Sequence, residues 1–218
     1  MRTATPIDTD SPQTPGELRR ALTGCRWLEE ALVRVAAEPL AIAVLFPAAG
    51  RHCGREDLRG APGWTADDAA RVVLLAAVPL RGPTLSAAVT SLYRYGDVGE
   101  RRAVLRALQW LYIGGSCVDL LRDALRTNDT RLVAAALGPC AAHLDDAAWR
   151  QGVLKCVFMG VPLSVVDGLS RRADGELGEM LAELASERHA AGRYIPTDAA
   201  ALLAVLRRGG GHGRERAA

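Results

Sequence analysis

The stretch from Asp145 to Arg193 reads DDAAWRQGVLKCVFMGVPLSVVDGLSRRADGELGEMLAELASERHAAGR and decides the fold of this chain. It contains two helical patterns joined by a short polar segment. Asp145 or Asp146 caps the first pattern, which runs to about Phe158, and Asp174 caps the second. Because charged and amide side chains recur on faces that are otherwise apolar, the stretch predicts two packed helices beside a polar site.

Signals that start helices recur upstream of this stretch. Residues 14–17 and 97–100 have the spacing of capping boxes, and Thr65 begins another helical pattern. The first box predicts one helix that is weakened by Gly24 and ends at Pro39. No convincing run of strands accompanies these patterns, so the elements expected are helices.

The sequence predicts an all-α fold, a single domain of about eight to ten helices in an orthogonal bundle or an irregular, solenoid-like array. The 218 residues suffice for one core, and only 5% of them are aromatic. Glycines and prolines predict a loop over residues 47–64. We expect the helical domain to span 14–207, with a disordered tail at 1–13 and a flexible tail at 208–218.

Charge and cysteine usage narrow the class of protein. The net charge is +2 with acidic residues interspersed throughout, which argues against nucleic-acid binding. No apolar run is long enough for a membrane span, and the N-terminus does not resemble a signal peptide. Five cysteines without a CxxC pair predict buried thiols in a reducing cytoplasm. No metal or cofactor is predicted, because Cys140 and His143 lack a second ligand pair.

Two cations in the stretch lie on faces expected to be buried. Lys155, the sole lysine, follows Gln151 by four residues, and could be an amine deprotonated by burial, a Schiff-base former or an anion clamp. Alternatively, its amine reaches solvent or pairs with one carboxylate. Arg188 falls within the apolar face of the next helix and needs a partner there. That partner is a ligand carboxylate or phosphate, or it is an acid such as Asp167, Glu187 or Asp123. A bridge to one of these acids would only lock helices together.

Several blocks of the chain resemble the EboA family. The blocks are TPGELRRAL (14–22), GWTADDAARVVLL (63–75), DVGERRAVLRAL (97–108), RTN (126–128), AWRQGVLKCVF (148–158), PL (162–163), GLSRRADGEL (168–177) and SERHAAGR (186–193). The resemblance implies an α-helical bacterial protein encoded in an ebo cluster. Such clusters make or export small specialised metabolites, beside enzymes that resemble sugar cyclases and prenyltransferases. The chain departs from the family pattern at Arg150, Ser170, Ser186 and His189, which predicts a divergent member whose ligand differs or whose site has decayed.

Two functions are compatible with these residues. The first is a cytoplasmic protein of specialised metabolism, an enzyme or intermediate-binding protein with a pocket for a polar or anionic small molecule. That pocket would be formed by Arg126, Asn128, Gln151, Lys155, Asp167, Arg171 and Arg188. The second is a non-catalytic helical adaptor that recruits other pathway enzymes through an exposed apolar patch. A homodimer is compatible with either function, and no catalytic residue is assigned.

Overall fold

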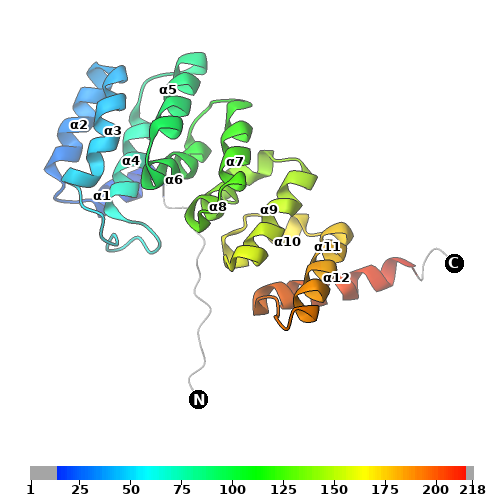
Figure 1. Ribbon diagram of the computed structural model, residues 1–218. Helices are drawn as coiled ribbons and strands as arrows, with labels where there is room; N and C mark the ends of the chain where they lie inside the picture. The colour runs from blue at the N-terminus through cyan, green and yellow to red at the C-terminus, as the bar shows by residue number, and fades with distance from the viewer. Residues whose placement is uncertain (1–13, 215–218) are drawn as a thin grey trace. The chain divides into compact units, whose positions relative to one another are not determined.

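A computed structural model describes residues 14–214 and confirms the all-α fold (Figure 1). Over this range the chain forms twelve α-helices and four short 3-10 helices, without a β-strand. The tail predicted at 1–13 lies outside the described residues. Within the described part of the chain, no helix combines the length and the apolar character that a membrane span requires.

The chain divides into two compact units, Met1–Pro79 and Leu80–Ala218. The first unit contains α1 (Pro15–Ala21), α2 (Arg26–Ala37), α3 (Ile42–His52) and α4 (Ala66–Ala77). Helix α4 is its centre, because α1, α2 and α3 all contact it and ten of its twelve residues are buried.

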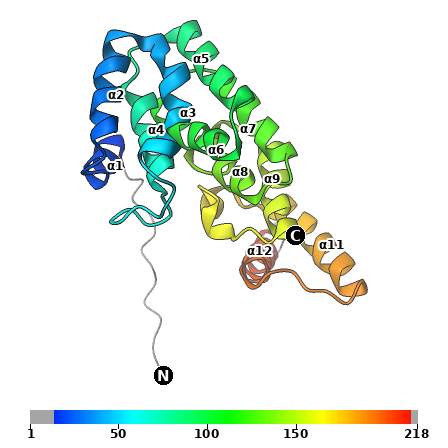
Figure 2. The same ribbon diagram turned by 60° about the vertical axis from the view of Figure 1, so that its left-hand side comes forward.

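Helices α2 and α3 form a hairpin through the short helix η1 (Pro39–Ala41), as the view in Figure 2 shows. The single helix predicted before Pro39 is wrong, because Gly24 adopts a left-handed conformation with φ of 101° and separates α1 from α2. The loop predicted over residues 47–64 begins later than expected, because α3 continues through Pro47 to His52. A proline is tolerated there because Ala43 is exposed, so the carbonyl that Pro47 leaves without a partner can bond to water.

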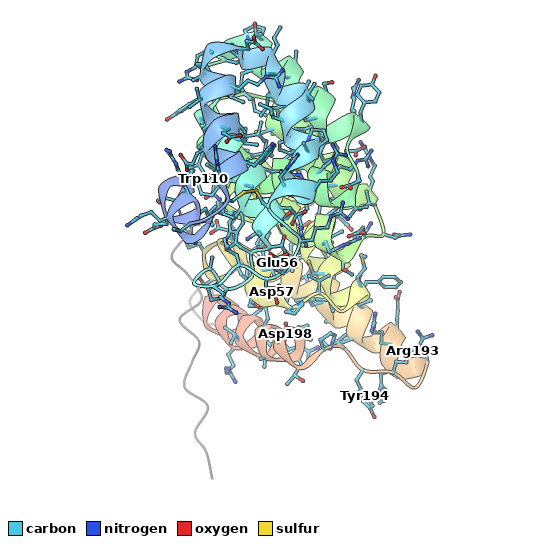
Figure 3. The ribbon with its side chains drawn as sticks, turned by 90° about the vertical axis from the view of Figure 1, so that its left-hand side faces the viewer. Glu56, Asp57, Trp110, Arg193, Tyr194 and Asp198 are labelled. Carbon is cyan, nitrogen blue, oxygen red and sulfur yellow. A yellow bond between two sulfur atoms is a disulfide. The ribbon has the colours of Figure 1, made fainter. Side chains whose placement is uncertain are left out.

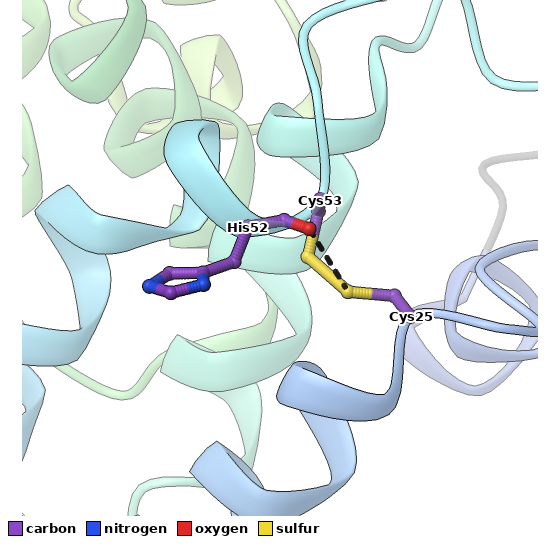
Figure 4. The surroundings of a disulfide bond; sticks show 3 residues. All are labelled: Cys25, His52 and Cys53. Atoms are coloured by element: carbon purple, nitrogen blue, oxygen red, sulfur yellow. Dashed lines mark hydrogen bonds between the residues drawn. A yellow bond between two sulfur atoms is a disulfide. The ribbon is translucent and has the colours of Figure 1, made fainter.

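The prediction of free thiols is wrong at two positions. Cys25 and Cys53 form a disulfide, with their Cα atoms 5.8 Å apart (Figure 4). The pairing follows from the hairpin, which brings together two residues separated by 28 positions in the sequence. Cys117, Cys140 and Cys156 are free and buried, as the sequence predicts.

The second unit is a succession of helices in which most pack on helices one or two places along the chain. Its members are α5 (Gly82–Tyr95), α6 (Val98–Ala107), α7 (Ser116–Arg126), α8 (Thr130–Ala136), α9 (Asp146–Met159), α10 (Leu169–Arg172), α11 (Gly175–Ala190) and α12 (Thr197–Arg214). Helices α5, α7, α9 and α11 contact one another in sequence, and α6 contacts α5 and α8. This order of contacts is typical of an irregular α-solenoid.

Several predicted helix starts are present as expected. The capping boxes at 14–17 and 97–100 both form, and the carboxylates of Asp145 and Asp174 accept hydrogen bonds from the first turns of α9 and α11. Helix α12 extends to Arg214, past the domain end expected at residue 207.

Candidate functional site

Lys155 caps a neighbouring helix. Its Nζ donates a hydrogen bond of 2.7 Å to the carbonyl oxygen of Leu125, in the last turn of α7. That end of a helix carries unsatisfied carbonyls and a partial negative charge, both of which favour an ammonium group. The lysine is half-buried, and the partner in the structure is a backbone carbonyl rather than the carboxylate considered from the sequence.

Arg188 makes the equivalent contact at the end of α9. Its guanidinium donates to the carbonyl oxygen of Phe158 at 2.8 Å and lies over the Phe158 ring, 5.5 Å from the ring centre. The partner in the structure is a helix C-terminus in place of the acid considered from the sequence. The side chain is half-exposed at the margin of α11, which removes the need for a buried counter-charge.

The other five predicted site residues lie at the surface or at its edge. Arg171 pairs with Asp167 at 3.6 Å and Arg126 with Asp123 at 3.8 Å, and both arginine side chains are about three-quarters exposed. Asn128 and Gln151 are exposed. The seven residues thus lie on α7, α9, α10 and α11 and in the segments between helices, and their role in ligand binding stays a prediction.

Sequence reasoning missed Arg172, which is the arginine of the pair that turns inward. It donates to the carbonyl oxygens of Ala141 and Leu144 at 2.8 and 2.9 Å and to the Asp146 carboxylate at 2.6 Å. Its guanidinium also covers the ring of the fully buried Trp149 at 4.8 Å. The signal that could have found it is the acid at 146, the first residue of α9, which needs no role in capping because Asp145 is the N-cap.

Arg150, one of the departures from the family pattern, joins α9 to α11. It contacts both carboxylate oxygens of Asp174 and reaches Glu176 at 2.8 Å. The hydrogen bond from Arg150 holds the pKa of the Asp174 carboxyl below its usual value. Arg150 therefore has two carboxylate partners at the start of α11, and these occupy its guanidinium.

The family-like block at the end of α11 forms an exposed turn. Figure 3 shows Arg193 and Tyr194 pointing outward there, with Asp198 at the start of α12. The ring of His189, another departure, lies 5.8 Å from the ring of Tyr194. Asp198 accepts a hydrogen bond of 2.7 Å from the backbone nitrogen of Leu163. The His189–Tyr194 ring contact and the hydrogen bond from Leu163 to Asp198 thus hold the two ends of this turn.

A groove of about 740 Å³ runs along the outer face of α5 in the second unit. It is lined by Gly82, Pro83, Ser86, Ala87, Thr90, Ser91, Arg94, Tyr95, Tyr112, Ile113, Gly114 and Ser116. The α5 positions recur at helical spacing and so form one wall, while the segment 111–116 forms the other. The hydroxyls of Ser86 and Ser116 join the two walls by a hydrogen bond of 2.7 Å. None of the seven residues predicted as a site lines this groove.

The groove presents aromatic, hydroxyl and cationic groups to solvent. Tyr95 and Tyr112 are 88% and 89% exposed, although each carries a large apolar ring. Arg94 is exposed, and within residues 14–214 its guanidinium has no hydrogen-bond or ion-pair partner. The lining contains no carboxylate, histidine, cysteine or lysine. Such a surface can stack on a ring, donate to hydroxyls and bind an anion.

Comparison with known proteins identifies the family. Residues 60–203 match the family model described as "Metabolite traffic protein EboA". The chain belongs to the EboA family. No curated protein and no solved structure matches the chain. The EboA match includes α4 of the first unit and the whole groove of the second, while residues 14–59, with α1 to α3, lie before it.

Proposed function

We propose that this EboA-family protein binds a small metabolite in the groove along α5 and carries it without transforming it. The ligand proposed is a polyhydroxylated ring with one anionic group, such as a sugar phosphate or cyclitol phosphate. The family description, metabolite traffic, supports a role in handling rather than synthesis. We further propose that the role belongs to specialised metabolism in a bacterial cytoplasm.

The observation that carries the proposal is the pair of exposed tyrosines beside Arg94, whose guanidinium has no partner among residues 14–214. Tyr95 and Tyr112 can each stack a ring on the apolar face of a sugar or cyclitol, which removes apolar surface of both partners from water. The hydroxyls of Thr90 and Ser91 offer hydrogen bonds to ligand hydroxyls, and Arg94 can bind a phosphate through two parallel N–H groups.

The groove supports binding better than catalysis. General acid–base or nucleophilic catalysis needs a group that holds or releases a proton near neutral pH, most often histidine, a carboxylate, cysteine or lysine. The twelve lining residues include none of these types. The thiols elsewhere in the second unit are buried, and burial raises the pKa of Cys140 to about 11 and of Cys156 to about 12. The proposal is therefore a carrier or intermediate-binding protein.

The test is a thermal-shift titration of the full chain against sugar phosphates and cyclitol phosphates, followed by calorimetry on any ligand that binds. A ligand present at about 100 times its Kd should add about 2.7 kcal/mol to the stability of the folded protein. Arg94→Gln should weaken binding by roughly tenfold or more, because it removes a charge-assisted hydrogen bond worth about 1.5–3 kcal/mol.

Lys155→Met is the matched control, since it removes a cation outside the groove. It should lower stability through the lost helix cap and leave Kd unchanged. The reverse result, with Lys155→Met abolishing binding and Arg94→Gln silent, would move the site to the seven residues predicted from the sequence. If no compound of either class binds, the carrier proposal is wrong.

An adaptor is the second candidate, favoured by apolar side chains on the surface of the first unit. Val33, Leu40 and Val44, on α2, η1 and α3, are 72%, 69% and 65% exposed. Exposed apolar surface marks protein contacts when it is contiguous over several hundred Å². Substituting all three residues by serine should weaken co-purification with enzymes encoded beside this protein and leave metabolite binding intact.

A further inference from the structure

The hairpin of α2 and α3 is closed at both ends. Helix η1 connects the two helices at one end, and the Cys25–Cys53 disulfide joins them at the other. Cys25 directly precedes the first residue of α2, and Cys53 directly follows the last residue of α3 (Figure 4). The covalent ring closed by the disulfide therefore contains the hairpin alone. We call the end of the hairpin that carries Cys25 and Cys53 its outer end, and cleavage of the disulfide would release this end.

The disulfide lies where a reductant can reach it. Both cysteines are half-exposed, and His52 beside them is exposed. Trp27, in the first turn of α2, stacks on the His52 ring with centroids 4.7 Å apart and planes 5° from parallel. Gly54 directly follows Cys53 and has a φ of 84°, a left-handed conformation that ends the path of α3 beside the disulfide. The fluorescence of Trp27 can therefore report on changes at this end of the hairpin.

The helix end at Cys25 favours thiol–disulfide exchange at this sulfur. Exchange proceeds through thiolates, which positive charge stabilises. Cys25 occupies the N-cap of the twelve-residue α2, at the positive end of the helix dipole. Cys53 follows the negative end of α3 and lies between Arg51 and Arg55 in the sequence, with the Glu56 carboxylate against Gly54. The three free cysteines are buried, so the chemistry is selective for one pair.

The core of the first unit does not depend on the disulfide. Helix α2 buries Leu28, Ala31 and Val35, and α3 buries an apolar face that includes Phe46. Both helices contact α4 independently of each other. Cleavage of the disulfide would leave these contacts in place and change only the outer end of the hairpin.

We propose that Cys25 and Cys53 form a reversible thiol–disulfide site, which a dithiol reductant opens while the protein stays folded. A thiolate of the dithiol attacks one sulfur and releases the other cysteine as a thiolate. The second thiol of the reductant then resolves the mixed disulfide. Two electrons and two protons pass from the dithiol to Cys25 and Cys53, and the reductant leaves as its own disulfide. Both cysteines precede the region matched by the EboA model. This site does not rest on the proposed carrier function.

The test is native-state thiol mapping of the full chain. The protein is incubated with dithiothreitol, alkylated without denaturant and mapped by mass spectrometry, and a second sample is returned to oxidised glutathione before alkylation. We expect Cys25 and Cys53 to be labelled after reduction and protected again after oxidation. Cys117, Cys140 and Cys156 should stay unlabelled throughout.

Tryptophan emission provides the second readout, since opening the outer end should disturb the stack of Trp27 on His52. The emission change on reduction should vanish in Trp27→Phe and in Cys53→Ser. If the disulfide is reduced only in urea, it is a structural disulfide that the reductant cannot reach in the folded protein, and the proposal is overturned. Failure to reoxidise, or labelling of the three buried cysteines at the same rate, would also overturn it.

Discussion

At the scale of single residues, three cations of the second unit bind backbone carbonyls. Lys155, Arg172 and Arg188 each donate to carbonyl oxygens contributed by another segment of the chain. The ends of helices leave carbonyls that lack intrahelical partners, and a long cationic side chain can satisfy them while keeping part of its charge in water. Lys155 and Arg188, which the sequence offers as ligand contacts, therefore each connect two helices in the structure.

Arg172→Ala should destabilise the protein by about 2–4 kcal/mol. The substitution removes charge-assisted hydrogen bonds to two carbonyls and uncovers the buried Trp149 ring. Arg171→Ala is the matched control, because its side chain is 74% exposed and its ion pair is long, so its effect should stay within about 0.5 kcal/mol. Urea unfolding measured by circular dichroism compares the two, and equal losses would contradict the assignment.

The Arg150–Asp174 pair predicts a loss of stability in acid. Because the pKa of Asp174 is lowered in the folded protein, its contribution is present above the unfolded value of about 3.9 and disappears as pH falls through the folded value. Asp174→Asn keeps a residue that can cap α11 but removes this titration. Its unfolding free energy should vary less with pH below about pH 4 than that of the wild type. Parallel curves from urea unfolding at pH 2.5–5 would argue against the pair.

At the scale of elements, α9 approaches its neighbours closely at Gly152. A Cβ atom at this position would lie 2.9 Å from Cδ2 of Leu137 and 3.3 Å from Cδ2 of Leu125. Leu137 is fully buried and has little room to move. Glycine therefore sets the packing distance of α9 against the segments that carry these leucines.

Gly152→Ala should destabilise by about 1–2 kcal/mol, since an overpacking cost of about 1–3 kcal/mol exceeds the gain in helix propensity of up to about 1 kcal/mol. Gly175→Ala, at the first position of α11, meets no atom within 4 Å and should be neutral or slightly stabilising. Thermal unfolding distinguishes the two substitutions. A stabilising Gly152→Ala would mean that Leu137 can move aside freely.

At the scale of the whole molecule, the proposed activities lie in different compact units. The disulfide hairpin belongs to Met1–Pro79, and the groove along α5 belongs to Leu80–Ala218. The EboA match covers the groove but not the hairpin. A ligand and a reductant should therefore act on separate parts of the chain.

Hydrogen exchange read by mass spectrometry tests this separation. Reduction with a dithiol should speed exchange at the ends of α2 and α3 and leave α5 unchanged. A bound sugar phosphate or cyclitol phosphate should slow exchange in α5 and in residues 111–116 and leave α2 and α3 unchanged. An effect of reduction on α5 would show that the two features are coupled.

The sequence by itself determined the helical class, the family and the helix starts at Thr14, Asp97, Asp145 and Asp174. These depend on local signals, because a capping side chain and its backbone partner are only two or three residues apart. The buried free thiols at 117, 140 and 156 were also predictable, since cysteine is among the residue types most often buried.

The tertiary structure alone decided which segments meet. The partner of Lys155 lies 30 residues earlier in the chain, and Cys25 meets Cys53 only because α2 and α3 fold back on each other. The groove likewise requires the face of α5 to lie opposite residues 111–116. A helical pattern shows which face of one helix is apolar or charged. It does not show what covers that face, because the partner is set by packing between elements distant in the sequence.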